Sequence, residues 1–279
     1  MRVDFMMIGA QKCATTTLAR QLAYHPDICF CKIKEPAYFN RTQNWQEGLE
    51  NYHQLYSPVE GQICGEASTM YTSLPEWQGT HSRLFAYNPN LKLIYIMRQP
   101  VERVISGYAH LLLQSAVKDS PKIAVLADPR YINRSRYGVQ IRPYLDLFKR
   151  ENILLLIFEE YIADQLKTLK QIAMFLSVSP DAFQGVDTTL RDNETVGEGE
   201  LKTPVRQLMT LNLFQAIRLR IPSSIRKTIR PYLANRLDKK PYFLPALKET
   251  IWRFVEDDVV TIEGLLGRRL EIWRNGYGD

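Results

Sequence analysis

Residues 4–18 join an apolar run, a tight turn that carries one lysine, and a run of three threonines. The apolar run predicts a buried strand, and the threonines open a segment that we expect to be a helix. The first N–H groups of a helix lack partners within it, and the helix dipole adds partial positive charge there. A strand, a turn and a helix start of this kind form an anion site, to which Lys12 adds a full charge. The sequence therefore predicts an α/β fold with a phosphate-like ligand at this turn.

The spacing within the turn narrows the kind of site. A Walker loop has Gly, four further residues, and then Gly-Lys-Ser/Thr. Here Lys12 follows Gly9 by three residues, and Ala14 replaces the second glycine. An ordinary NTPase loop is therefore disfavoured, although the order of strand, loop and helix is the same as in such proteins. The alternative is a plain first strand and helix, with Lys12 as a solvated loop residue.

A second segment predicts another anion contact. Residues 91–97 form an apolar run that leads into Arg98, and Pro100 then suits a helix start because its missing N–H costs nothing there. We expect Arg98 at the carboxyl end of this strand, where ligands bind in open α/β sheets. Ser106 lies about two turns into the helix. An arginine and a hydroxyl that meet at this edge can hold one more phosphate.

These two segments resemble sulfotransferases that use 3′-phosphoadenosine 5′-phosphosulfate (PAPS). Residues 12–18 are similar to the family's 5′-phosphosulfate loop, and residues 98–108 to its 3′-phosphate motif. Other similar segments follow in the same order and favour the heparan-sulfate-type and bacterial branch: His25-Pro26-Asp27, residues 34–39, residues 65–71 and residues 265–273. The resemblance implies one P-loop-like sulfotransferase domain over residues 1–279. Its expected fold is α/β, with a central, mostly parallel sheet flanked by helices.

The resemblance also implies a donor site, in which Lys12 stabilises the bridging oxygen as it leaves. For Cys13 the residues themselves favour a small side chain that fills a tight turn. Ser135 either helps to hold the nucleotide or caps a helix, and a loop with Lys202 and Arg206 is expected to close over the 3′-phosphate. The expected donor-binding residues are Gln11, Lys12, Cys13, Ala14, Thr15, Thr16, Thr17, Arg98, Ser106, Ser135, Lys202 and Arg206.

A base must take the proton of the acceptor. Glu35 is the expected base, since residues 34–39 resemble the segment that carries the family's catalytic glutamate, and carboxylates serve this role when their surroundings tune the pKa. The alternative for Glu35 is a surface partner of Lys32 or Lys34. His110 is the competing candidate for the base. A histidine at such a position more often lies on a helix face without a catalytic role. We expect no metal in the reaction.

The acceptor is less constrained. Ala67 stands where that branch often has lysine, which removes one contact near the acceptor. We expect transfer to a hydroxyl or an amine nitrogen of a small-molecule natural product, for example a cationic alkaloid toxin. A glycan or glycolipid acceptor is the alternative.

Composition agrees with one globular enzyme. The chain has 279 residues, 45% hydrophobic and 24% charged, and no apolar run approaches a membrane span. The N-terminus passes straight into the first strand, so we expect a cytoplasmic, bacterial protein without a signal peptide. The four cysteines suggest neither a disulfide framework nor a zinc site.

Two other classes of function stay open. A small-molecule kinase with a modified P-loop could use residues 153–160 as an acid-ended strand, but it lacks Gly-Lys-Ser/Thr. A non-catalytic polyanion-binding protein could use the basic residues within 218–240 and the net charge of +6. That segment carries no known nucleic-acid motif, so we expect no nucleic-acid partner.

The remaining pattern predicts alternating strands and helices. We expect strands at 91–97 and 153–158, and helices at 16–24, 137–150 and 162–176. Residues 121–136 are expected to be irregular.

Overall fold

A computed structural model describes residues 1–41, 44–189, 200–201, 234–235, 237 and 239–276, and within 200–201 and 234–235 it describes the backbone alone. Five strands form an all-parallel sheet in the order β2-β3-β1-β4-β5. They are β1 (Phe5–Gly9), β2 (Ile28–Phe30), β3 (Ile63–Ala67), β4 (Lys92–Met97) and β5 (Ile153–Ile157). A separate antiparallel pair joins β6 (Glu200–Leu201) to β7 (Ala234–Asn235).

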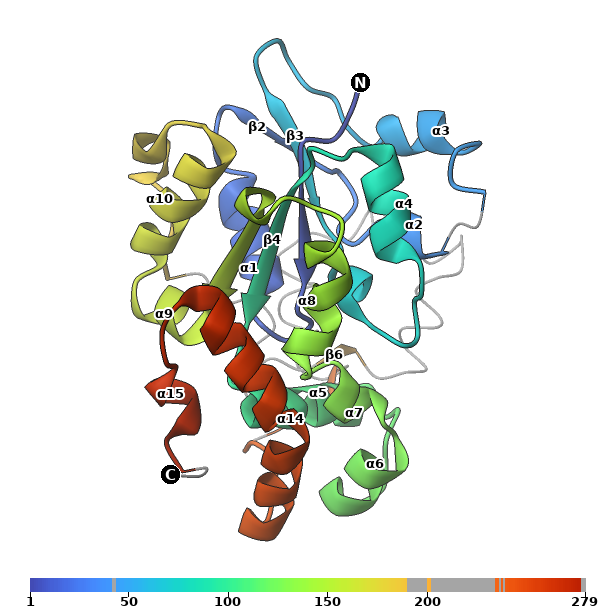
Figure 1. Cartoon of the computed structure of the whole chain (residues 1–279), viewed down its shortest axis with the longest axis vertical. Helices are drawn as coiled ribbons and strands as arrows, with labels where there is room; N and C mark the ends of the chain where they lie inside the picture. Colours follow the sequence, from blue (N-terminus) through green and yellow to red (C-terminus); the bar gives the residue numbers. More distant parts are fainter. Residues whose placement is uncertain (42–43, 190–199, 202–233, 236, 238, 277–279) are drawn as a thin grey trace.

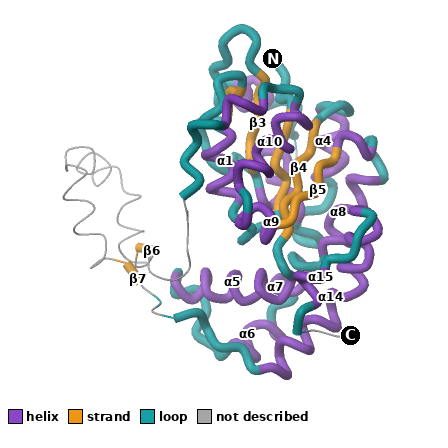
Figure 2. Tube along the Cα trace, turned by 90° about the vertical axis from the view of Figure 1, so that its left-hand side faces the viewer, coloured by secondary structure: helices purple, strands orange, loops and turns teal. Residues whose placement is uncertain are grey.

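Helices flank the sheet, as predicted for an α/β fold (Figure 1). The described α-helices are α1 (Thr15–Leu22), α2 (Tyr38–Arg41), α3 (Leu49–His53), α4 (Thr80–Tyr87), α5 (Pro100–Leu113), α6 (Pro121–Ala127), α7 (Arg130–Asn133), α8 (Tyr137–Leu145), α9 (Phe158–Ala163), α10 (Gln165–Leu176), α14 (Pro245–Leu266) and α15 (Glu271–Arg274). Three short 3-10 helices are η1 (Thr69–Thr72), η2 (Arg150–Asn152) and η3 (Pro180–Phe183). Helices α1 and α10 cover one face of the sheet, and α4 and α8 cover the other, while α5, α6, α7 and α14 lie beyond the carboxyl ends of the strands (Figures 1 and 2).

The strands form where the sequence is continuously apolar. All five residues of β1 are buried, and β5 has the sequence Ile-Leu-Leu-Leu-Ile with four of its five residues buried. Parallel strands covered by helices on both faces need such runs rather than an alternating pattern. The strands predicted at 91–97 and 153–158 are therefore confirmed, as β4 and β5.

Capping side chains decide where two helices begin. At the start of α5 the side chain of Gln99 accepts a hydrogen bond from the N–H of Glu102 at 2.7 Å, and Pro100 occupies the first turn. At the start of α10 the carboxylate of Asp164 accepts from the N–H of Lys167 at 2.9 Å. This cap interrupts the helix predicted at 162–176, so that α9 ends at Ala163 and α10 begins at Gln165.

Two other predictions need correction. Residues 121–136 are not wholly irregular, because they contain α6 and α7. Pro121 lies in the first turn of α6, where a proline starts a helix rather than breaking one, and the apolar residues after it are compatible with a helix. The helix predicted at 137–150 is shorter than expected and ends at Leu145.

The sheet order fixes where a ligand site lies. β1 is central, with β3 on one side and β4 on the other. The chain leaves β1 toward β2 and later crosses back to β4, so the order reverses beside β1. Open α/β sheets bind ligands at such a point, beyond the carboxyl ends of the strands. Within the described residues, no helix combines the length and the apolar character that a membrane crossing requires.

Candidate active site

The loop between β1 and α1 has a backbone suited to anions. Lys12 and Ala14 have φ of 71° and 58°, in the left-handed region. Ala14 is the N-cap of α1 and makes no side-chain cap, and the first turn of α1 holds no acidic residue. Successive N–H groups in such turns converge on a concave site for an anion. The N–H groups at the start of α1 therefore gain no side-chain acceptor from the cap residue and face no competing acid in the first turn.

Two of the threonines that follow are largely enclosed, and the third meets a second lysine. Thr15 and Thr17 are buried, whereas Thr16 is half-buried. The Nζ atom of Lys34 donates to Oγ1 of Thr16 at 2.5 Å. Lys34 thus lies at the start of α1, where its charge adds to that of Lys12. Sequence reasoning treated Lys34 only as a partner of Glu35, although the pattern Lys-Glu-Pro after a short strand was available as a signal.

Glu35 lies at the same edge of the sheet. Its N–H donates to the carbonyl of Ala67, the last residue of β3, at 3.2 Å. Its carboxylate Oε1 is 3.8 Å from Nζ of Lys34, and its side chain is 34% exposed. Glu35 itself has φ of 55°. The structure therefore brings the expected base to the helix start through Lys34, and the surface pairing named as an alternative is also present.

Arg98 follows β4, as predicted, and its guanidinium lies near an aromatic ring and a carboxylate. Its guanidinium Cζ lies 4.8 Å from the centre of the Phe158 ring, and Nη2 is 3.5 Å from Oε2 of Glu102. Ser106 lies two turns along α5 and is buried. Lys240 also approaches Glu102, with its Nζ 3.6 Å from Oε2.

Tyr137 joins the loop after β1 to the end of β4, a role that sequence reasoning missed. Its hydroxyl donates to the carbonyl of Arg98 at 2.7 Å and lies 4.0 Å from Sγ of Cys13. Tyr137 is fully buried at the start of α8. Cys13 is buried as well, and burial raises the pKa of its thiol to about 11, against the opposing effect of Arg103 and Arg98. The thiol is therefore protonated at neutral pH, which agrees with a small side chain that fills the turn.

Ser135 and Arg103 form a buried pair behind the loop. Nε of Arg103 donates to Oγ of Ser135 at 2.5 Å, and that hydroxyl in turn donates to the carbonyl of Pro100 at 3.1 Å. Both side chains are buried, and burial lowers the pKa of Arg103. The Ser135 hydroxyl is thus engaged within the protein, and it does not cap α8, whose N-cap is Arg136.

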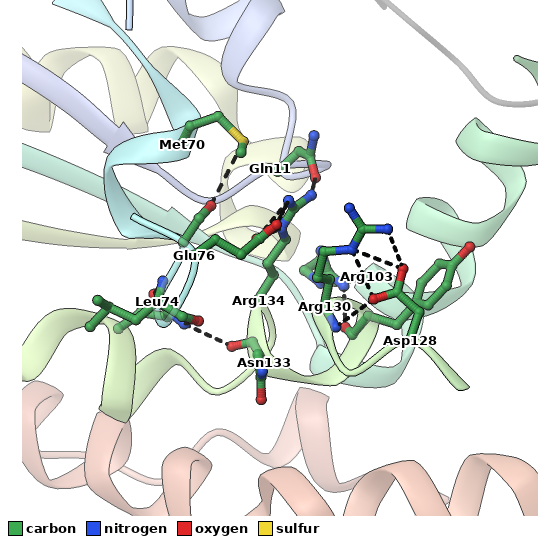
Figure 3. Close-up of polar contacts among 12 residues, drawn as sticks. Gln11, Met70, Leu74, Glu76, Arg103, Asp128, Arg130, Asn133 and Arg134 are labelled. Carbon is green, nitrogen blue, oxygen red and sulfur yellow. Dashed lines mark hydrogen bonds and ion pairs between the residues drawn. The ribbon is translucent and has the colours of Figure 1, made fainter. Parts of the chain in front are cut away.

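The side chain of Gln11 is held by an arginine. Nη1 of Arg134 donates to Oε1 of Gln11 at 2.8 Å, and the same guanidinium pairs with Glu76 (Figure 3). His110, the competing base, lies one turn beyond Ser106 on α5 and its Nε2 is 3.0 Å from Nε2 of Gln114. Lys202 and Arg206 lie outside the described residues, as does most of the basic segment 218–240.

The acid-ended strand suggested for a kinase is engaged in structural contacts. Glu159 Oε1 accepts from the N–H of Gln99 and Oε2 accepts from the indole N–H of Trp273, both at 2.9 Å. Glu160 pairs with Arg268 at 2.6 Å. Both oxygens of Glu159 thus accept hydrogen bonds from neighbouring N–H groups.

A family model described as the sulfotransferase domain matches residues 2–203. The human carbohydrate sulfotransferase 15 is 23% identical over 245 residues, which cover 63% of this chain and 44% of that protein. The mouse heparan sulfate glucosamine 3-O-sulfotransferase 3A1 is 29% identical over 188 residues, which cover 62% of this chain and 45% of that protein. The chain thus spans less than half the length of these curated relatives.

A solved structure of a sulfotransferase from Alicyclobacillus acidocaldarius has the same fold over nearly the whole chain. The TM-score is 0.67 at 25% identity, and the match covers 98% of this chain and 99% of that one. The match therefore extends beyond the residues that the family model covers.

Proposed function

This chain belongs to the sulfotransferase family, and on that premise we propose that it transfers a sulfuryl group from PAPS to a hydroxyl or amine nitrogen of an acceptor. The observation that carries the proposal is the loop between β1 and α1. Its left-handed backbone at Lys12 and Ala14, its N-cap without a side-chain acceptor, the charge of Lys12 and the nearby Lys34 suit a phosphosulfate group. Bound PAPS supplies an activated sulfuryl group and leaves as 3′-phosphoadenosine 5′-phosphate (PAP).

The residues of the loop hold and polarise the donor. Main-chain N–H groups and the hydroxyls of Thr15, Thr16 and Thr17 hold the 5′-phosphosulfate. Lys12 neutralises charge that develops on the leaving oxygen, with Lys34 close to the same helix start. Fixed donors of this kind stabilise developing charge without reorganising during the reaction. Positioning and electrostatics carry most of a transfer of this type, as they do in phosphoryl transfer.

The second anion contact comes from the end of β4. Arg98 and Ser106 hold the 3′-phosphate, and Tyr137 ties the backbone of Arg98 to the loop through its buried hydroxyl. Lys202 and Arg206 remain proposed contacts to the same phosphate. Ser135 supports the site indirectly, because its hydroxyl accepts a hydrogen bond from Arg103.

Glu35 accepts the proton of the acceptor. The half-exposed carboxylate at the carboxyl end of β3, beside Lys34, supports this role. His110 is the second candidate.

We propose a small molecule as the acceptor, which includes cationic natural products. Ala67 at the end of β3 supports this choice, because its side chain offers no charge to a polyanionic sugar. A glycan or glycolipid is the alternative, favoured by the carbohydrate substrates in the names of the two curated relatives.

Calorimetric titration with PAP, beside ATP-Mg, tests the donor site. We expect tight PAP binding that weakens in Lys12→Ala and in Arg98→Ala. Lys149→Ala and Arg253→Ala are matched controls, because each removes an exposed positive charge. They should bind PAP as the wild type does.

Each outcome is informative. Absence of PAP binding by the folded wild type would overturn the sulfotransferase proposal. Binding of ATP-Mg in place of PAP would support the kinase, and steeply salt-dependent binding of a polyanion alone would support the non-catalytic protein. PAP binding would allow acceptors to be screened with PAPS.

A further inference from the structure

Arg134 makes two kinds of contact with its guanidinium at the edge of the donor loop. One edge, formed by Nε and Nη2, grips the carboxylate of Glu76 at distances of 3.0, 3.0 and 2.7 Å. The remaining Nη1 donates to Oε1 of Gln11 at 2.8 Å. Arg134 and Glu76 are 18% and 24% exposed. Because this arginine is partly buried and forms a bidentate pair with Glu76, it is poorly placed to move and bind an anion itself.

The contact fixes the direction of the Gln11 amide. A guanidinium only donates hydrogen bonds, so Gln11 must present its oxygen to Arg134. The amide NH2 group then points the other way, and Figure 3 shows the nitrogen of Gln11 turned away from Arg134. Gln11 is the residue before Lys12. Two donor hydrogens are thus directed away from the Arg134 pair, on the residue that precedes the lysine of the loop.

The backbones that carry this pair are held together by a buried side chain. Gln140 accepts a hydrogen bond from the N–H of Leu74 at 2.7 Å through Oε1. Its Nε2 donates to the carbonyls of Leu74 and Asn133, both at 2.9 Å. Leu74 precedes Glu76 by two residues, and Asn133 precedes Arg134 by one. Gln140 is fully buried on α8, so the geometry of the pair is set by the scaffold rather than by two free surface chains.

We propose that Arg134 and Glu76 are positioning residues that hold the Gln11 amide as a hydrogen-bond donor to the sulfuryl group of bound PAPS. The inference rests on the proposed function and deepens it by giving the sulfuryl group a donor of its own. PAP lacks that group, so the Gln11 contact should contribute to binding of PAPS and not of PAP.

The test compares the affinities of PAPS and PAP by calorimetry, and it needs no acceptor. Gln11→Leu removes the donor and should reduce the preference for PAPS over PAP by roughly 10-fold, the value of one hydrogen bond to a charged group. Arg134→Leu with Glu76→Leu removes both positioning groups without leaving a buried charge, and it should reduce the preference in the same direction. Arg134→Lys should be intermediate, since a lysine lacks the rigid fork.

Arg130→Leu is the matched control. Arg130 lies four residues before Arg134, and its guanidinium pairs with Asp128 at 2.7 Å. Its loss removes a positive charge from the same segment without touching the Arg134 pair, and it should leave the preference for PAPS unchanged. Thermal denaturation of every variant identifies any that fail to fold.

Glu76→Gln separates the proposal from direct anion binding by Arg134. If Arg134 bound the ligand itself, neutralising Glu76 would free it and tighten binding of both nucleotides. Under the proposal, PAP affinity stays within about 2-fold and the preference for PAPS falls. Wild-type PAP binding with an unaltered PAPS preference in Gln11→Leu and in the double variant would overturn this inference and leave the proposed function standing. Loss of PAP binding in the wild type would instead overturn the proposed function.

Discussion

At the scale of single residues, a buried carboxylate beside the expected base gives this protein a pH dependence. Glu66 on β3 is fully buried, and neither of its carboxylate oxygens has a hydrogen-bond partner among the described residues. Burial raises its pKa to about 7, although Tyr71, Tyr52 and other nearby hydroxyls pull it down. The next two residues along the chain contact the segment that carries Glu35, since the carbonyl of Ala67 accepts from the N–H of Glu35 and Ser68 Oγ accepts from that of Ala37.

We predict that Glu66→Gln flattens the dependence of unfolding free energy on pH. The pKa of Glu66 is higher in the folded state than in the unfolded chain, so its stabilising contribution is complete below about pH 4.5 and is lost as the pH rises through about 7. Relative to Glu66→Gln, the wild type should lose up to about 3 kcal/mol between pH 5 and pH 8. Denaturant unfolding of both proteins across this range measures the difference. Parallel curves would contradict the prediction.

A second prediction concerns Lys34. Because its ammonium lies on Thr16 at the start of α1, Lys34→Ala should weaken PAP binding by roughly 3- to 10-fold and reduce its salt dependence. Lys32→Ala is the control, since Lys32 belongs to the same segment but donates to Ser57 at 2.6 Å. Calorimetry at two salt concentrations measures both effects. Equal losses in the two variants would show that only the net charge of the segment matters.

At the scale of elements, the junction of β1 with the anion loop depends on a glycine. A Cβ atom on Gly9 would lie 2.1 Å from Oγ1 of Thr72 and 2.7 Å from Cε2 of Tyr95. Thr72 cannot easily move, because its hydroxyl donates to the carbonyl of Ile8 at 2.8 Å, and Tyr95 is fully buried. The strand therefore has to end in a residue without a side chain.

We predict that Gly9→Ala destabilises the fold by about 1–3 kcal/mol and abolishes tight PAP binding, because the clash displaces the first residues of the loop. Gly264→Ala is the matched control within α14, where an added Cβ meets no atom within 4 Å. That change should stabilise the protein by about 0.5–1 kcal/mol, the cost of a glycine inside a helix. Thermal unfolding and PAP titration distinguish the two. Unchanged PAP affinity in Gly9→Ala would count against the role given to this junction.

The elements also show where sequence patterns mislead. The cap at Asp164 divides one periodic apolar segment into α9 and α10, since the hydrophobic period continues across the break. Pro121 was interpreted as part of an irregular segment, whereas it begins α6. The hydrogen bond to the Asp164 cap sets the boundary of α10, whereas the proline in the first turn sets that of α6.

At the scale of the whole molecule, the C-terminal helix α15 reaches the segment that follows β4. Trp273 on α15 is fully buried, and its indole N–H donates to Glu159, whose other oxygen accepts from the N–H of Gln99. The carbonyl of Trp273 accepts from the side-chain amide of Gln99 at 3.2 Å. Gln99 precedes α5 and follows Arg98, so a residue near the end of the chain supports the proposed 3′-phosphate contact. That a single domain spans residues 1–279 stays a prediction.

We predict that Trp273→Ala costs about 3–5 kcal/mol of stability and weakens PAP binding through Arg98. Trp273→Phe retains most of the packing and loses the N–H donor, so it should cost about 1–3 kcal/mol because Glu159 is left with an unpaired oxygen. Ile272→Ala, at an exposed position of the same helix, should have little effect on either quantity. Denaturant unfolding and PAP titration of the three variants test this order. A Trp273→Ala protein that is destabilised yet binds PAP normally would confine the role of α15 to folding.

The sequence by itself determined the class of fold, and it predicted which residues lie at the turn after the first strand. Residues 5–18 encode strand, turn and helix start through local preferences, so Lys12 and the threonines were found without a structure. Arg98 was found for the same reason, because continuous apolar runs mark parallel strands and ligands gather where they end. The expected roles of these residues in PAPS binding remain predictions that the PAP titration tests.

Only the tertiary structure decided which distant side chains meet there. Lys34 with Thr16, Arg134 with Gln11, and Trp273 with Glu159 come from separate elements, and no local pattern specifies their pairing. Parallel strands bring their carboxyl ends to one edge, but buried clamps such as Gln140 and Tyr137 set the orientation of each group. Hydrogen bonds act over about 3 Å and depend on direction, whereas the order of residues fixes only how far apart along the chain two groups lie.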